Sequence, residues 1–228
     1  MAQDEGKWHE LLQNLRLQLR RGMDGDVSSQ QRRSGLEYKV NFGVNILRLK
    51  EIAKSLPADQ ELADLMWSKE VRELRLLSIY IRPISSVSLE GATMLVHEVD
   101  TLEVAEQLSF SLLRRLPFAI PLLRSLFTSF VDPSTPVATV RYLLLNHLAL
   151  DNALTPSLFR EFSPHIIRDF THPDFYSLAT LYNALQRIAY DRPDLPLEDI
   201  CNAVVADGNA QTKSLAMNLL SIITADHD

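Results

Sequence analysis

Arg141 has the setting that most suggests chemistry in this chain of 228 residues. It interrupts an apolar stripe formed by Val137, Leu144 and Leu148, at the spacing i, i+4, i+7 and i+11 of one helix face. A guanidinium placed there must be paired, or must reach water along its stem. One hypothesis is a functional arginine that pairs an acid or binds phosphate. The alternative is a snorkelling arginine or a structural ion pair.

Phe110 is the aromatic candidate, because it falls on the polar side of the helix expected to start at Thr101. A ring in that position can serve as a stacking surface, but the pattern favours cover by the next helix. Isolated surface charges are typically only solvated. The cations considered as phosphate contacts are Lys39, Arg48, Lys54, Arg82, Arg114 and Arg115.

The sequence lacks the residue patterns of metal sites, phosphate-binding loops and catalytic cysteines. His97-Glu98 begins like a zinc-protease motif, but Thr101 stands where the second histidine would be. The six histidines have no metal-ligand spacing, and the seven glycines form no phosphate-binding loop. Cys201, the single cysteine, lies in an apolar helical context that indicates packing. The sequence therefore predicts neither a metal nor a cofactor.

Length alone allows one domain or two, and one domain over residues 1–228 is expected because a helical solenoid is a single continuous object. The hydrophobic fraction is 46 %, which is ordinary for a folded protein, and no apolar run reaches the roughly 18 residues of a membrane span. The start, MAQDEGKWHE, is polar and acidic, unlike a signal peptide. One cysteine fits a reducing compartment. A cytoplasmic protein without a membrane partner is expected.

The segment Tyr38–Pro83 predicts three successive helices. Asn45 is a candidate cap for the first, and Pro57 ends it. The second covers Asp59–Trp67, with Trp67 in the core. Ser68 is expected to cap the third, which runs to Ile81 and is apolar on two sides. A helix with two apolar sides must be covered on both, as in a stacked solenoid.

The rest of the chain continues the same pattern, with about twelve helices in all and no convincing strand. Pairs recur every 35 to 45 residues or so, within the range of HEAT repeats. The other expected helices are Glu5–Arg21, 29–34, Ser88–Glu98, Thr101–Leu116, Pro117–Phe130, Thr135–Leu150, two short ones starting at Thr155 and Pro164, Pro173–Tyr190, Leu197–Val205 and Gln211–Ile223.

The phrases NFGVNILRLKEIAK and LMWSKEVRELRLLSIYI, within residues 41–81, resemble the AlkD-type DNA alkylation repair family. The resemblance is clearest over residues 35–120. It implies an all-α, right-handed superhelix of about six antiparallel HEAT-like helix pairs. It also implies that DNA lies on the concave face and that alkylated purines are removed.

The same resemblance supplies two catalytic candidates, Glu106 and Arg141. The family's pattern is W-x-x-x-D, and its best counterpart here is Leu102–Glu106, so Leu102 replaces the tryptophan and Glu106 the aspartate. A shifted alignment would select Glu103 or Asp100 instead. Arg141 lies where the family's arginine would fall, and a pair with Glu106 is one hypothesis for it. The plain alternative is that Glu106 is a solvated surface acid.

The net charge of −6 divides unevenly along the chain. Residues 1–56 hold ten Lys and Arg against seven Asp and Glu, whereas residues 115–228 hold eight against twelve. Because DNA binding depends on cations, a basic amino-terminal flank is a candidate contact, but the protein as a whole repels DNA at long range, so composition counts against the family's chemistry. The sequence favours an AlkD-like protein that binds double-stranded DNA, with glycosylase activity doubtful. The alternative is a non-catalytic HEAT-repeat scaffold that binds a protein or peptide in its groove.

Overall fold

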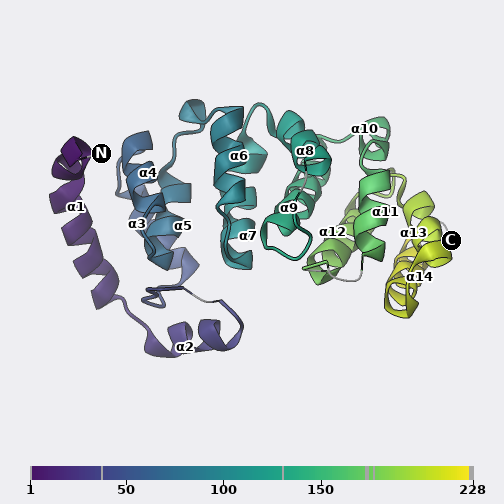
Figure 1. The fold of residues 1–228 in the computed structure, drawn as a ribbon, viewed down its shortest axis with the longest axis horizontal. Coiled ribbons are helices and arrows are strands. Elements are labelled where there is room, and N and C mark those ends of the chain that lie inside the picture. The colour runs from purple at the N-terminus through teal and green to yellow at the C-terminus, as the bar shows by residue number, and fades with distance from the viewer. Residues whose placement is uncertain (1, 37, 130, 173–174, 177, 226–228) are drawn as a thin grey trace. The chain divides into compact units, whose positions relative to one another are not determined.

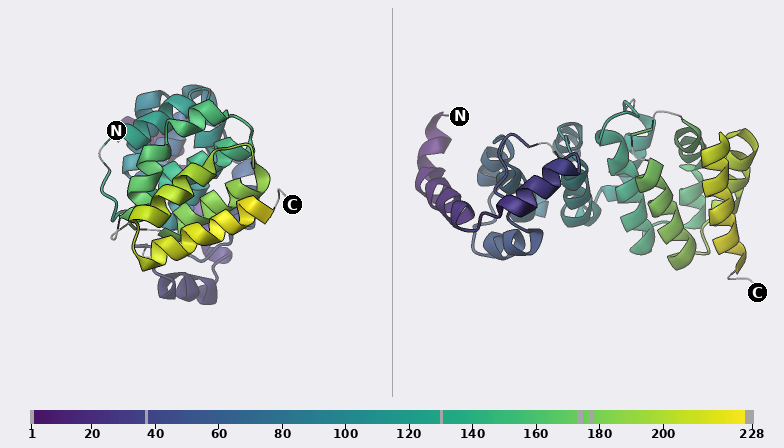
Figure 2. Two further views of the ribbon diagram at one scale, coloured as in Figure 1. Left: turned by 90° about the vertical axis from the view of Figure 1, so that its right-hand side faces the viewer. Right: turned by 90° about the horizontal axis from the view of Figure 1, so that it is seen from below.

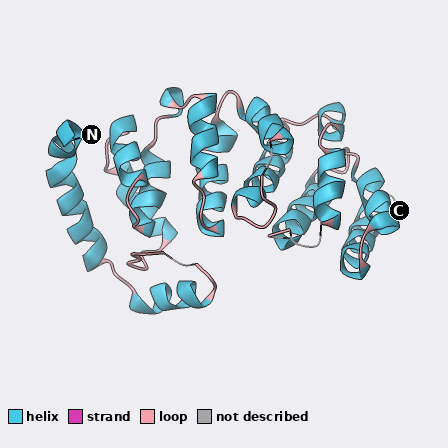
Figure 3. Ribbon diagram, viewed as in Figure 1, coloured by secondary structure: helices cyan, strands magenta, loops and turns pink. Residues whose placement is uncertain are grey.

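Helices are the main secondary structure of the residues that the computed structural model describes, which are 2–36, 38–129, 131–172, 175–176 and 178–225. These residues form fourteen α-helices and two short 3-10 helices, and they contain no strand (Figures 1 and 3). They divide into two compact units. The expectation of a single domain over residues 1–228 stays a prediction.

The first unit contains the described residues up to Ser88 together with Thr101–Leu112. An isolated parallel bridge joins Val40 to Val71 within it. Its helices are α1 (Ala2–Arg21), α2 (Gly25–Arg33), α3 (Ile46–Lys54), α4 (Gln60–Trp67), α5 (Arg72–Ile81), the 3-10 turn Ile84–Ser86 and α7 (Leu102–Ser111).

Short polar side chains cap three of these helices at their expected starts, and Asn45 is the one that the sequence predicted as a cap. Asn45 accepts a hydrogen bond from the Arg48 N–H at 2.9 Å, and Asp59 caps α4 in the same way. Thr101 caps α7. These bonds satisfy donors that a helix leaves unpaired at its start.

The expectation that Ser68 caps the third helix is wrong. Ser68 is the residue that closes α4, and α5 begins after Val71 without a side-chain cap. The reason is tertiary: the Arg72 N–H donates to the carbonyl of Val40 at 3.0 Å, so a distant segment satisfies it.

The second unit contains Leu89–Asp100 and the described residues from Leu113 on. Phe130, Pro173 and Asp174, which the sequence placed at helix ends, lie outside the described residues. The helices are α6 (Leu89–His97), the 3-10 turn Leu113–Arg115, α8 (Ala119–Thr128), α9 (Val137–Leu150), α10 (Pro156–Arg160), α11 (Ser163–Thr171), α12 (Leu178–Asp191), α13 (Leu197–Asp207) and α14 (Ala210–Ala225).

Thr155, the expected start of a short helix, caps α10, and the helix expected over Thr135–Leu150 is α9. That helix starts after Pro136 without a side-chain cap. The core assignments of Trp67 and Cys201 are confirmed, since both are buried. Burial raises the pKa of the Cys201 thiol to about 12, which matches a packing role and keeps the thiolate form scarce.

Arg141 is buried within the second unit. Its Nη2 lies 2.6 Å from Oδ2 of Asp169, and the Tyr142 hydroxyl donates to the same oxygen. The partly exposed Arg168 binds the other oxygen at 3.1 Å. Rings of Phe127, Tyr142 and Phe175 surround the guanidinium; their centroids lie 5.5–5.9 Å from it. This arrangement links α9 to α11 through one buried charge pair.

We expect Asp169→Asn to destabilise the protein by about 3–5 kcal/mol, because it leaves the Arg141 charge buried without its counter-charge. The matched control is Arg168→Gln, which removes the more exposed partner of the same carboxylate and should cost no more than about 1 kcal/mol. Urea unfolding followed by circular dichroism measures both. Equal losses would show that burial does not set the strength of this pair.

Candidate nucleic-acid interface

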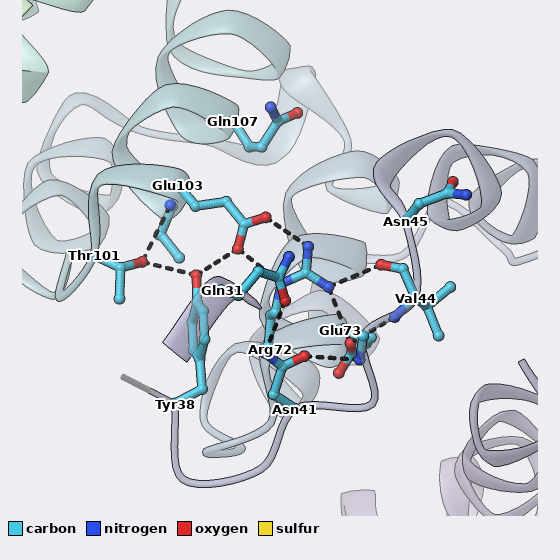
Figure 4. Close-up of polar contacts among 12 residues, drawn as sticks. Gln31, Tyr38, Asn41, Val44, Asn45, Arg72, Glu73, Thr101, Glu103 and Gln107 are labelled. Atoms are coloured by element: carbon cyan, nitrogen blue, oxygen red, sulfur yellow. Dashed lines mark hydrogen bonds and ion pairs between the residues drawn. The ribbon is translucent and has the colours of Figure 1, made fainter. Parts of the chain in front are cut away.

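A buried charge cluster of Arg72, Glu73 and Glu103, here called the Arg72 cluster, lies within the first unit (Figure 4). Arg72 is 1 % exposed and forms a bidentate salt bridge with Glu103. Its Nε lies 2.8 Å from Oε2, and its Nη2 lies 2.5 Å from Oε1. The Tyr38 hydroxyl donates to Glu103 at 2.7 Å. The pair therefore fastens α5 to α7, and Tyr38 brings the connecting segment 38–45 to the same point.

Glu73 is the second buried carboxylate of the Arg72 cluster. It accepts the backbone N–H groups of Phe42 and Val44 at 3.2–3.3 Å, and Arg72 Nη1 lies 3.0 Å from it. Arg72 Nη1 also donates to the carbonyl of Val44 at 2.8 Å. One cation cannot neutralise two carboxylates. Backbone N–H groups of segment 38–45 therefore stabilise the remaining negative charge by hydrogen bonds to Glu73. This segment is thus held by the same charges that join the helices.

Segment 38–45 leads directly into α3, and α3 brings Lys50 to the surface of the unit. The Lys50 ammonium lies 5.3 Å from the ring centroid of Phe110 on α7 and 5.5 Å from that of Tyr80 on α5. The Tyr80 hydroxyl donates to Gln107 at 2.8 Å. Phe110 is 44 % exposed. We call Lys50, Tyr80, Gln107 and Phe110 the Lys50 site.

The Lys50 site combines a cation with an accessible aromatic surface. Among the described residues, no carboxylate lies within ion-pair distance of the Lys50 ammonium, whose recorded contacts are the two rings. Leu47, one turn earlier on α3, is 76 % exposed and adds apolar surface beside it. An ammonium next to such a ring can contact a phosphate while the ring stacks on a base.

Glu106 lies on α7 one turn before Phe110 and is exposed. Partial desolvation raises the pKa of its carboxyl, and the negative charge of Glu103 adds to the effect. Glu103, the alternative from a shifted alignment, is committed to Arg72. Asp100 belongs to the second unit.

Arg141 and Glu106 fall in different compact units, and the recorded charge partner of Arg141 is Asp169. The structural ion pair, which the sequence left open as an alternative, is the arrangement observed. The catalytic assignment of these two residues stays a prediction.

Several of the cations that were predicted to contact phosphate form ion pairs with acidic side chains of this chain instead. Lys39 pairs with Glu70, Lys54 with Glu51, and Arg114 with Asp151. Arg82 is 6 % exposed and pairs with Asp64 at 2.6 Å, so it is mostly withdrawn from solvent. Arg48 and Arg115 are exposed. Phosphate binding by any of these six residues stays a prediction.

Sequence reasoning missed the Arg72 cluster and the role of Lys50. One signal for the cluster was present: Arg72 and Glu73 adjoin each other in a helix with apolar residues on two sides, which leaves little polar surface for both. Nothing in the sequence pairs Arg72 with Glu103, which lies 31 residues further on. Lys50 has an ordinary lysine context, and only the packing of α3, α5 and α7 brings it over two rings.

No helix of the described residues is long and apolar enough to cross a membrane. The described part of the chain also contains no group of three or more side chains suited to hold a metal ion.

Neither the family models nor the curated proteins contain a match to this chain. A solved structure does match, with a TM-score of 0.72 over 84 % of this chain and 82 % of that one, at 16 % sequence identity. Its description reads "A new family of proteins related to the HEAT-like repeat DNA glycosylases with affinity for branched DNA structures". The likeness confirms the all-α, HEAT-like fold that the resemblance in the sequence implied.

The Arg72 cluster predicts that stability falls in alkaline solution. Burial and the charge of Glu103 raise the pKa of Tyr38 well above its usual value. Above pH about 10 the unfolded chain loses the phenolic proton while the folded protein keeps it, so the folded state loses stability as pH rises. Tyr38→Phe should make the loss of unfolding free energy between about pH 9 and 11 shallower. Tyr190→Phe, which alters an exposed tyrosine, should leave the slope unchanged; equal slopes in all three proteins would contradict the assignment.

Proposed function

We propose that this HEAT-like repeat protein binds DNA through the Lys50 site and prefers branched or single-stranded DNA, which can offer uncovered base faces, to plain duplex. The observation that carries the proposal is the Lys50 ammonium above the exposed ring of Phe110. The described affinity of the structural neighbour for branched DNA supports the same class of ligand.

The chemistry of the Lys50 site suits unpaired bases. In a duplex, each base is covered above and below by its neighbours, so a protein ring has no free base face to stack on. Branch points and single-stranded ends offer such faces, and base–aromatic stacking contributes about 1–3 kcal/mol for each base. Lys50 adds attraction for the adjoining phosphate. The Tyr80–Gln107 hydrogen bond holds the second ring in place beside the first.

The proposal does not include removal of alkylated bases. Leu102 stands where the resembling family has tryptophan, and it provides no flat surface for a cationic sugar or base. DNA binding without catalysis is therefore the function that the geometry supports best.

We expect Phe110→Ala to raise the Kd for a four-way DNA junction by about 5- to 100-fold, which corresponds to the loss of one base stack. The Kd for a linear duplex of the same length should change much less. Fluorescence anisotropy with labelled DNA at 50 mM and 150 mM salt measures both. Tyr190→Ala, which removes an exposed aromatic ring from the second unit, is the matched control. An unchanged preference for the junction in Phe110→Ala would contradict the proposal.

A base-release assay separates binding from catalysis. Duplex DNA with N7-methylguanine should release no base above the rate measured with Glu106→Gln. Release by the native protein that Glu106→Gln abolishes would assign a catalytic role to Glu106 and extend the proposed function to repair.

A further inference from the structure

Four exposed arginines lie at the ends of two successive helices in the first unit. Arg20 and Arg21 end α1, and Arg32 and Arg33 end α2. We call these four residues the arginine arm. No carboxylate among the described residues lies within ion-pair distance of any of them. Lys7, Lys39 and Lys54 of the same unit, by contrast, each pair with an acid.

The arginine arm is a local excess of positive charge on an acidic protein. Residues 16–48 hold seven Lys and Arg against three Asp and Glu, a net charge of +4 in a chain whose total is −6. Exposed cations that lack internal partners keep their full attraction for an external anion.

Helix α2 is held by polar contacts and contributes no buried residue to the core. The Asp24 N–H donates to the carbonyl of Phe42 at 2.9 Å, and Asn41 donates to Gln31 at 2.9 Å. Gly43, at φ 73°, allows the close approach, since a Cβ there would lie 2.0 Å from the Asp24 carbonyl oxygen. Within its unit, α2 lies apart from the neighbouring helices (Figures 1 and 2). Core packing therefore does not explain its presence.

The dimensions and chemistry of the arginine arm fit a DNA backbone. A nine-residue helix is about 13 Å long, and B-DNA presents one phosphate charge for about every 1.7 Å of its axis. The guanidinium fork matches phosphate oxygens. Membrane-surface binding requires an apolar helix face, whereas α2, GDVSSQQRR, has a single apolar side chain, Val27.

We propose that the arginine arm is a second DNA contact, which holds the phosphate backbone of a duplex segment while the Lys50 site engages unpaired bases. The inference rests on the proposed function and names its substrate class: DNA in which a duplex arm adjoins a branch or a single strand. Segment 38–45 connects the two surfaces, because Asn41 and Phe42 contact the start of α2 and Asn45 caps α3.

The test compares a four-way junction with a linear duplex for the double variant Arg32→Gln/Arg33→Gln. Each phosphate contact contributes about 0.9 to the slope of log K against log salt. We expect the slope to fall by about two and the Kd at 100 mM salt to rise by tenfold or more for both DNAs. The preference for the junction should survive, because the Lys50 site remains intact.

Two controls complete the experiment. Arg160→Gln/Arg187→Gln changes the net charge equally on exposed arginines of the second unit and should leave both Kd values within about twofold. Arg32→Lys/Arg33→Lys keeps the charges and should retain most of the salt slope.

The two proposals fail in different ways. If the arm variant and its control weaken binding equally, general charge repulsion explains the loss and the arginine arm is not a contact. If the arm variant binds like the native protein while Phe110→Ala loses junction binding, the inference about the arm is overturned and the proposed function stands. If the native protein binds neither DNA at low salt, the proposed function itself fails.

Discussion

The pairing of Arg72 with Glu103 is the interaction on which the first unit depends. It joins α5 to α7 in a buried environment, where one partner without the other would be strongly destabilising. The second carboxylate, Glu73, turns the pair into a cluster with an excess negative charge. Backbone N–H groups of segment 38–45 stabilise this excess negative charge by hydrogen bonds to Glu73. An irregular segment is thereby bound to the buried charges of the core.

The placement of both candidate DNA contacts follows from the Arg72 cluster. On one side, segment 38–45 ends in the cap of α3, and α3 presents Lys50 to the rings on α5 and α7. On the other side, segment 38–45 contacts α2 and its cap: Asn41 donates to Gln31, Phe42 accepts from the Asp24 N–H, and Gly43 lies against the Asp24 carbonyl. A buried network of this kind is suited to hold surface groups in a defined geometry, because its hydrogen bonds have few alternative arrangements. The cluster is thus a positioning element, while the exposed groups supply the chemistry.

The second unit also contains a buried arginine–carboxylate pair that joins two helices. Arg141 and Asp169 join α9 to α11, and three aromatic rings surround the guanidinium. The apolar stripe around Arg141 indicated in the sequence that its guanidinium is either paired or reaches water along its stem, and the structure shows the paired arrangement. The partner was not identifiable in the sequence, because Asp169 lies on another helix 28 positions later.

The sequence by itself determined the helices, most of their approximate ends and the cap at Asn45, since helix period and capping are local properties of the chain. The HEAT-like fold also followed from residues 41–81. Only the tertiary structure decided which charges are buried and which remain exposed. Arg72, Arg141, Lys50 and Arg32 carry similar charge in the sequence, yet two lie in buried ion pairs and two reach the surface. The reason is that burial and pairing depend on contacts between helices far apart along the chain, which no local pattern encodes.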